Sequence, residues 1–181
     1  MLAGRRLILS RKRFITNYSI PFTVGLMGSV ALFFSSNLLF DSTIPFSPAV
    51  LILLAIPATA IALFLNQYTA LRLKQIDTGL SKENNYKFAK IALENLQWEI
   101  NVDTKGYIET FNPLGDITTW EDQMISIIID DNVILINSIC NVDSIVLNQS
   151  AFSLGKNRQN VRRFLEQFEL ASSNYVSIHS N

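Results

Sequence analysis

Residues 124–140 read MISIIIDDNVILINSIC, two β-branched runs separated by Asp130-Asp131-Asn132. Because β-branched residues favour strands and Asp and Asn favour tight turns, this stretch predicts a β-hairpin. Its two runs, 127–129 and 133–136, are continuously apolar rather than alternating, which is typical of strands buried on both faces. We therefore expect this hairpin to lie in the centre of a sheet.

A second hairpin is predicted just upstream. Residues 98–112 read WEINVDTKGYIETFN, in which apolar and polar side chains alternate on either side of a DTKG turn. The alternation places Trp98, Ile100 and Val102 on one side of the sheet. The loop 113–122 joins the two hairpins, and DSIVLNQ, residues 143–149, is a candidate fifth strand.

A helix is predicted at each end of this group of strands. Residues 82–96 carry an amphipathic apolar stripe behind Ser81, a favourable N-cap. A last helix is predicted from about Asn157, the expected N-cap, with a stripe formed by Val161, Phe164, Leu165 and Phe168. The order helix, four or five antiparallel strands, helix predicts a two-layer α+β domain over residues 82–170, followed by a flexible tail at 171–181.

The first third of the chain is of a different kind. Residues 21–40 and 48–68 are almost wholly apolar, and no charged side chain lies between Arg13 and Asp41 or between Ser42 and Leu71. Twenty helical residues span roughly 30 Å, the thickness of the bilayer hydrocarbon. The sequence therefore predicts a membrane α-helical hairpin, with a short extracytoplasmic loop at 41–47.

Basic residues flank this hairpin on one side only. They lie in the segment 1–20 and in the linker 69–81, which contains Arg72 and Lys74, while the loop 41–47 has none. Basic residues stay on the cytoplasmic side of membranes, so both termini and the α+β domain are predicted to be cytoplasmic. Two alternatives remain open: a cleaved signal peptide at the N-terminus, and a buried helical hairpin in a soluble protein.

Composition excludes several classes of function. Residues 1–80 hold seven basic and two acidic side chains, whereas residues 81–181 hold eight and thirteen. The acidic second half argues against nucleic-acid binding. With one cysteine and one histidine, the chain offers no His/Cys zinc cluster, and no cofactor motif is present.

Catalytic constellations are sparse. Cys140 or Ser138 would need His179 as a base, two residues from the C-terminus. A cluster of carboxylates could bind a cation or act as acid and base, although its spacing matches no calcium loop and Asp is common in turns. Its members would be Asp116, Glu121, Asp122, Asp130 and Asp131.

The best candidate for a functional surface is the start of the last helix. Its basic side chains lie where the helix dipole disfavours cations, so an anion such as a phosphate or lipid head group would stabilise them. The residues are Lys156, Asn157, Arg158, Arg162 and Arg163. The plainer alternative is local pairing on a solvated face, for example between Arg162 and Glu166.

The segments INSIC, 136–140, and SLGKNRQNVRRFLEQF, 153–168, carry a resemblance. In them the chain resembles uncharacterised bacterial membrane-anchored proteins with a C-terminal α+β domain. It is also loosely similar to the domain of unknown function family numbered 1499, through Leu154, Gly155 and Asn157. The chain differs from that family in the longer stretch between Ser138 and Gly155. It also lacks the arginine and second serine expected after Ser138.

The resemblance implies this fold in the bacterial inner (plasma) membrane and implies no enzymatic activity. We therefore expect a non-enzymatic integral membrane protein whose cytoplasmic α+β module binds or organises a protein or anionic partner at the inner face. The expected partners are the bilayer, a protein or an anionic lipid head group, and a homo-oligomer is left open. The alternative function is a membrane-bound enzyme acting on a lipid or phosphorylated substrate.

Overall fold

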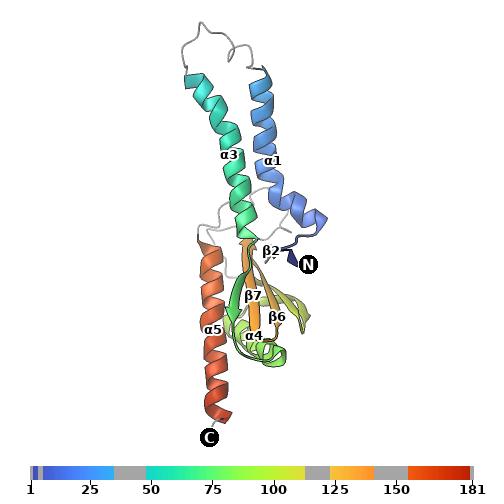
Figure 1. Ribbon diagram of the computed structural model, residues 1–181, viewed down its shortest axis with the longest axis vertical. Coiled ribbons are helices and arrows are strands. Elements are labelled where there is room, and N and C mark those ends of the chain that lie inside the picture. The colour runs from blue at the N-terminus through green and yellow to red at the C-terminus, as the bar shows by residue number, and fades with distance from the viewer. Residues whose placement is uncertain (1, 4–5, 35–47, 113–122, 141–154, 180–181) are drawn as a thin grey trace. The chain divides into compact units, whose positions relative to one another are not determined.

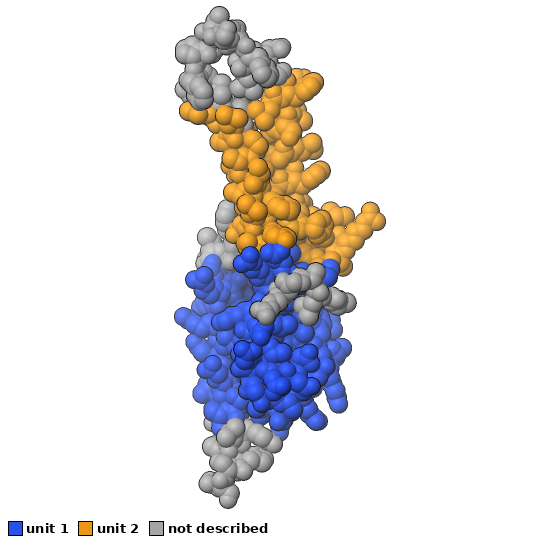
Figure 2. Space-filling model, viewed as in Figure 1, with its two compact units in different colours: residues 1–8, 70–181 blue, residues 9–69 orange. Residues whose placement is uncertain are grey.

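The computed structural model describes residues 2–3, 6–34, 48–112, 123–140 and 155–179. The chain falls into two compact units (Figure 2). Unit 1 comprises residues 1–8 and 70–181, and unit 2 comprises residues 9–69. Unit 1 is therefore larger than the predicted domain 82–170, because it also includes both segments that flank the apolar helices.

Unit 2 is formed by two antiparallel helices, α1 (Arg11–Phe34) and α3 (Pro48–Ala70, whose last residue belongs to unit 1) (Figure 1). Their contacts run in opposite directions along the two helices. A Cβ added to Gly25 would lie 3.6 Å from Cβ of Ala60, and the rings of Tyr18 and Phe64 are 4.9 Å apart. The helices also approach closely at Gly28, where an added Cβ would lie 2.7 Å from Cγ2 of Ile56.

Helix α1 starts ten residues before the predicted span 21–40, at Arg11 rather than Pro21. The backbone N–H of Arg13 donates to Oγ of Ser10 at 3.4 Å, and that of Phe14 donates to the Ser10 carbonyl at 2.8 Å. These bonds satisfy amides of the first turn, so the helix can begin within the basic segment. Residues 35–40 of the predicted span lie outside the described residues.

Unit 1 contains a five-stranded antiparallel sheet in the order β3-β7-β6-β5-β4. Both predicted hairpins are confirmed, and β6 and β7 occupy interior positions as predicted. Asn132 adopts the left-handed conformation, φ 62°, that a tight turn between β6 and β7 requires. The strands are β3 (Lys74–Asp77), β4 (Glu99–Thr104), β5 (Tyr107–Asn112), β6 (Gln123–Asp130) and β7 (Val133–Cys140).

Strand β3 belongs to the sheet although the sequence analysis assigned no strand to that segment. Strand β3 lies in the segment 69–81, which was predicted to be a linker, and pairs with β7 from Lys74↔Ile136 to Asp77↔Val133. Only four residues long, β3 has three exposed side chains, and only Ile76 packs against the core. Such an edge strand has almost no periodic signal of its own. The candidate strand 143–149 lies outside the described residues.

Strand β4 also differs from prediction, because its register with β5 shifts between Ile100 and Val102. Ile100 pairs with Thr110 and Val102 with Glu109. Neighbouring residues of β5 point to opposite faces, so Ile100 and Val102 do too. The prediction that they share one side was wrong because a β-bulge at Asn101 reverses the alternation.

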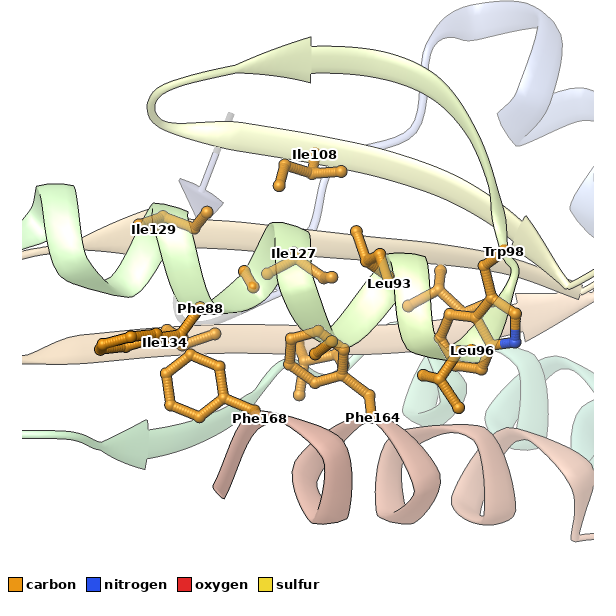
Figure 3. Packing of buried hydrophobic residues seen from close by; sticks show 14 residues of the cluster. Phe88, Leu93, Leu96, Trp98, Ile108, Ile127, Ile129, Ile134, Phe164 and Phe168 are labelled. Carbon is orange, nitrogen blue, oxygen red and sulfur yellow. The ribbon is translucent and has the colours of Figure 1, made fainter. Parts of the chain in front are cut away.

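Two helices, α4 (Lys82–Leu96) and α5 (Lys156–His179), cover one face of the sheet (Figure 1). Helix α4 has the predicted bounds and N-cap, with Oγ of Ser81 accepting from the N–H of Asn84 at 3.4 Å. The core between the layers is apolar (Figure 3). Phe168 meets Phe88 edge to face at 6.3 Å between ring centroids. The predicted apolar stripe of the last helix is thus confirmed as its buried face.

Helix α5 continues to His179, beyond the predicted end of the domain at residue 170 and into the segment predicted to be a flexible tail. No glycine or proline interrupts the stretch. Oγ of Ser172 donates to the carbonyl of Glu169 at 3.0 Å, and Oγ of Ser173 donates to that of Leu170 at 3.1 Å. Because these hydroxyls bond within the helix, the serine-rich sequence does not break it.

The N-terminal residues also belong to unit 1, where β1 (Leu2–Ala3) pairs with β2 (Arg6–Leu7). The N–H of Leu7 donates to the carbonyl of Leu71 at 3.0 Å, and the backbones of Arg6 and Arg72 form an isolated antiparallel β-bridge. The two segments that connect unit 1 with unit 2 are therefore hydrogen-bonded to each other.

Candidate functional site

A chain of buried polar side chains joins the sheet to the start of α5. Nδ2 of Asn112 donates to Oδ1 of Asn160 at 3.1 Å, and Nδ2 of Asn160 donates to Oγ of Ser138 at 3.3 Å. Oγ of Ser138 in turn donates to Oδ1 of Asn157 at 3.3 Å. Asn112, Ser138 and Asn160 are all buried. We name these four residues the polar chain.

The residues of the polar chain can contact one another because each lies near the end of its strand or at the start of α5. Asn112 ends β5, Ser138 lies near the end of β7, and Asn157 and Asn160 are one helical turn apart on α5. Burying an amide or hydroxyl without a hydrogen-bond partner costs free energy. The polar chain therefore favours the one position of α5 on the sheet that satisfies all of its members. The first turns of α5 are thereby held against the sheet near the ends of β5 and β7.

The start of α5 differs from prediction in one detail. The helix begins at Lys156, and the carbonyl of Gly155 accepts from the N–H of Gln159 at 3.0 Å. Gly155, with φ 85°, therefore occupies the N-cap position that was predicted for Asn157. Asn157 is already helical, and its side chain bonds to Ser138 instead.

The four predicted basic residues are not equivalent. Arg158 and Arg162 are exposed, whereas Lys156 and Arg163 are half-buried. Arg162 pairs with Glu166 through Nε at 3.5 Å, with both side chains largely exposed, so local pairing is confirmed for this residue. Such a pair contributes little to stability. In the described part of the chain, Lys156 and Arg158 form no ion pair.

Two further basic residues, Arg72 and Lys74, lie just before and at the start of the edge strand β3, which neighbours β7. Nδ2 of Asn137 donates to the carbonyls of Ala70 and Arg72, at 2.7 and 2.6 Å, and so fixes the backbone just before β3. Arg72 and Lys74 are both exposed. We define the basic end of unit 1 as Arg72, Lys74, Lys156 and Arg158. In the sequence, Arg72 and Lys74 served only to predict the orientation of the chain in the membrane.

A second buried polar group lies on the opposite face of the sheet and was not predicted. Glu109 is 2% exposed. It accepts from Nδ2 of Asn101 at 2.8 Å and from the hydroxyl of Tyr107 at 2.9 Å, and that hydroxyl lies 3.3 Å from Oγ of Ser126. The Asn101 bond depends on the bulge in β4, which sequence alternation did not reveal. Both carboxylate oxygens of Glu109 thus accept a hydrogen bond, which offsets the cost of removing them from water.

The other predicted chemical sites receive no support from the described residues. Asp131 accepts from the N–H of Lys82 at 2.8 Å at the β6–β7 turn, the opposite end of β7 from Ser138. Asp116, Glu121 and Asp122 lie outside the described residues, as do the side chains of Cys140 and His179. Within the described ranges, no group of three or more His, Cys, Asp or Glu residues is arranged to hold a metal ion.

The pKa shifts that the structure resolves lie on the α4 side of unit 1. Nζ of Lys90 donates to Oδ2 of Asp103 at 2.7 Å, and the hydroxyl of Tyr86 donates to Oδ1 at 2.7 Å. The hydrogen bond from Lys90 lowers the pKa of Asp103 below its usual value, and the same bond raises the pKa of Lys90. This group ties α4 to β4 and is separate from the polar chain.

No family model, curated protein or solved structure matches this chain. The resemblance carried by INSIC and Gly155 therefore stays a prediction. Ser138 and Asn157, which belong to the two segments that carry it, are nevertheless hydrogen-bonded to each other.

Proposed function

We propose that this chain is a non-enzymatic integral membrane protein: α1 and α3 cross a bilayer as a hairpin, and unit 1 is a cytoplasmic module that binds an anionic or protein partner. Helix α1 is long and apolar enough to cross a membrane, and the described apolar part of α3 is the shorter stretch Leu54–Ala70. The proposal extends this to both helices because α3 has 23 residues and no charged side chain.

The observation that carries the proposal is the outward display of apolar side chains on unit 2. In the core helix of a soluble protein, most of the apolar face is buried. Only 17% of the most apolar stretch of α1 is buried. Large exposed apolar side chains occur on both helices: Phe14, Ile15, Phe22, Leu26, Met27, Val30, Phe33, Phe34, Leu51, Leu54, Ile61, Phe64 and Leu65. Such a surface is stable in lipid and unstable in water.

The packing of α1 on α3 favours a retained helix over a cleaved signal peptide. Small residues let helices approach closely in a membrane, and Gly28 lies directly against Ile56. An aromatic series, Phe14, Tyr18, Phe64 and Tyr68, lines one end of the pair with centroid separations of 4.7, 4.9 and 6.3 Å. Tyrosines are enriched at the membrane–water interface, so this end suits the boundary of a bilayer.

Charge supports the cytoplasmic placement of unit 1. Arg11, Lys12 and Arg13 begin α1, and Arg72 and Lys74 follow α3. All five lie at the ends of the helices that connect to unit 1, and basic residues at membrane boundaries remain on the cytoplasmic side. The basic end of unit 1, with its exposed Arg72, Lys74 and Arg158, is the surface that supports binding of an anionic partner.

Two measurements on the full chain test the proposal. Alkaline carbonate treatment of membranes should leave the chain in the pellet, and release into the supernatant would contradict membrane integration. A fluorescent protein that folds only in the cytoplasm, fused after Asn181, should be bright, while alkaline phosphatase at the same position should be inactive. The reverse pattern would overturn the orientation while leaving the membrane assignment intact.

A further inference from the structure

We infer that the basic end of unit 1 docks on the anionic head groups of the bilayer in which α1 and α3 are embedded. This inference rests on the proposed membrane function and names the partner of unit 1 as an anionic lipid surface. Its residues, Arg72, Lys74, Lys156 and Arg158, come from two segments of the chain that are more than eighty residues apart.

The two segments are brought together by adjacent residues of one strand. Asn137 binds the carbonyls of Ala70 and Arg72 on one face of β7, and Ser138 binds Asn157 on the other. Lys74 pairs with Ile136 and so lies on the face that α5 covers. Arg72, Lys74 and the first turn of α5 are thus held within a few residues of the same point on β7.

The chain connection keeps Arg72 and Lys74 close to the end of α3. Helix α3 ends at Ala70, and four residues of extended chain reach at most about 14 Å. Arg72 and Lys74 therefore remain near the end of the apolar helix, at the depth of lipid head groups. The bond from Ser138 to Asn157 holds the first turn of α5, with Lys156 and Arg158, beside β7, the strand with which Lys74 pairs.

The local charge matches an anionic surface. Arg72, Lys74 and Arg158 are exposed here, whereas the acidic residue of β3, Asp77, lies at the other end of that strand, paired with Val133. The acidic residue of α5's third turn, Glu166, is already paired with Arg162. Glu99 starts β4 at the opposite edge, four strands from β3 and so roughly 19 Å away. Basic clusters next to a membrane helix bind anionic leaflets, and each Lys or Arg favours the bound state about fivefold.

A protein or nucleic-acid partner fits the surface less well. The second half of the chain carries an excess of acidic side chains, which would repel nucleic acid. The basic end is an exposed cationic edge in which Arg72, Lys74 and Arg158 all reach solvent, without a large exposed aromatic residue beside them in the described part of unit 1. Protein interfaces ordinarily centre on such an aromatic anchor.

The test uses the full chain in lipid nanodiscs made of phosphatidylcholine alone or mixed with phosphatidylglycerol. Amide hydrogen exchange of residues 70–77 and 156–163 should be slower in the anionic discs, and added salt should abolish the difference. Equal exchange in the two discs, from a chain that resists carbonate extraction, would overturn the inference and leave the proposed function standing. A chain extracted by carbonate would overturn both.

Matched variants assign the effect to named residues. The pair Lys74→Gln with Arg158→Gln should lose roughly twenty-five-fold of the lipid-dependent protection, because two cations are removed. The pair Lys82→Gln with Lys105→Gln makes the same charge change away from the basic end and should retain it. Equal loss in both pairs would contradict a local surface. Protection by inorganic phosphate in neutral discs would show a free-phosphate site and overturn the assignment to lipid.

Discussion

Asn137 and Ser138, neighbours on β7, hold two different segments on opposite faces of the sheet. Asn137 binds the backbone that enters unit 1 from α3, and Ser138 binds the first turn of α5. Because side chains alternate along a strand, two adjacent polar residues suffice to join both segments to one point. A change at either position should therefore affect one segment and spare the other.

Removal of the Ser138 hydroxyl should destabilise unit 1. In Ser138→Ala, the buried Nδ2 of Asn160 loses its partner, so the free energy of unfolding should fall by about 1–3 kcal/mol. Denaturant unfolding in detergent, followed by tryptophan fluorescence, measures this change. Ser173→Ala, which removes an exposed hydroxyl from α5, is the control and should stay within about 0.5 kcal/mol of wild type. Equal stability of the two variants would show that the polar chain contributes nothing.

Asn137→Leu should loosen the segment before β3. The substitution removes two hydrogen bonds, to Ala70 and Arg72, each contributing about 0.5–1.5 kcal/mol. Trypsin should then cleave after Arg72 about tenfold faster, since every 1.4 kcal/mol changes an opening equilibrium tenfold. Asn95→Ala, which removes only an exposed bond to Gln167, should leave the cleavage rate unchanged. An unaltered rate in Asn137→Leu would mean that other contacts hold the segment.

Gly28→Ala should weaken the helix pair, whereas Gly25→Ala should not. An added Cβ at Gly28 would meet the stiff, β-branched Ile56 at 2.7 Å, while one at Gly25 would make an ordinary 3.6 Å contact with Ala60. Overpacking of this kind costs about 1–3 kcal/mol. Titration with sodium dodecyl sulfate should therefore unfold Gly28→Ala earlier and Gly25→Ala no earlier than wild type. Similar behaviour of the two variants would refute the close approach at Gly28.

The Lys90–Asp103 pair should make stability depend on pH. The bond from Lys90 lowers the folded pKa of Asp103, so its contribution is complete above the unfolded value of about 3.9 and is lost as pH falls through the folded pKa. The pair is partly exposed, which limits the effect to about 0.2–1 kcal/mol. Wild type should lose more stability than Asp103→Asn between roughly pH 5 and pH 2.

The raised pKa of Lys90 adds an alkaline counterpart to this effect. Its contribution is complete below the unfolded value of about 10.4 and is lost as pH rises through the folded pKa. Lys90→Met should remove the same interaction from the other side. Asp103→Asn should then have a smaller effect in the Lys90→Met background than in wild type. Parallel acid titrations of wild type and Asp103→Asn would contradict the pair's role.

The strongest sequence signals predicted the fold of unit 1 well. Long periodic segments, such as the stripe of α4 and the two β-branched runs around Asp131, bury enough apolar surface to determine their own structure. The turn at Asn132 added a local backbone preference that agrees with that pattern. Local and tertiary preferences coincide there, so sequence alone was sufficient.

The parts that were missed depend on tertiary contacts. Strand β3 is stabilised by pairing with β7, and the bulge at Asn101 by the buried Glu109, neither of which has a local signature. Asn160 could have been noticed, because it lies four residues before Phe164 on the buried face of α5. A polar residue on an apolar stripe implies a buried partner, here Asn112 and Ser138.

The basic residues of α5 were found from sequence, but their surroundings were not. Sequence placed Lys156 and Arg158 near the helix start, and it treated Arg72 and Lys74 only as markers of topology. The antiparallel pairing of β3 with β7 is what brings the two sets to one edge. A property of the sheet, rather than of either segment, thus creates the candidate surface.

The pairing of β3 with β7 also constrains the order in which the chain can fold during synthesis. Lys74 emerges from the ribosome directly after α3, but its partner Ile136 is made 62 residues later. Helix α4 and the β4–β5 hairpin can form in that interval, while β3 remains unpaired. Strand β3, which follows α3 in the chain, therefore joins the sheet only after β7 has been made, and this delay gives α1 and α3 time to reach the bilayer first.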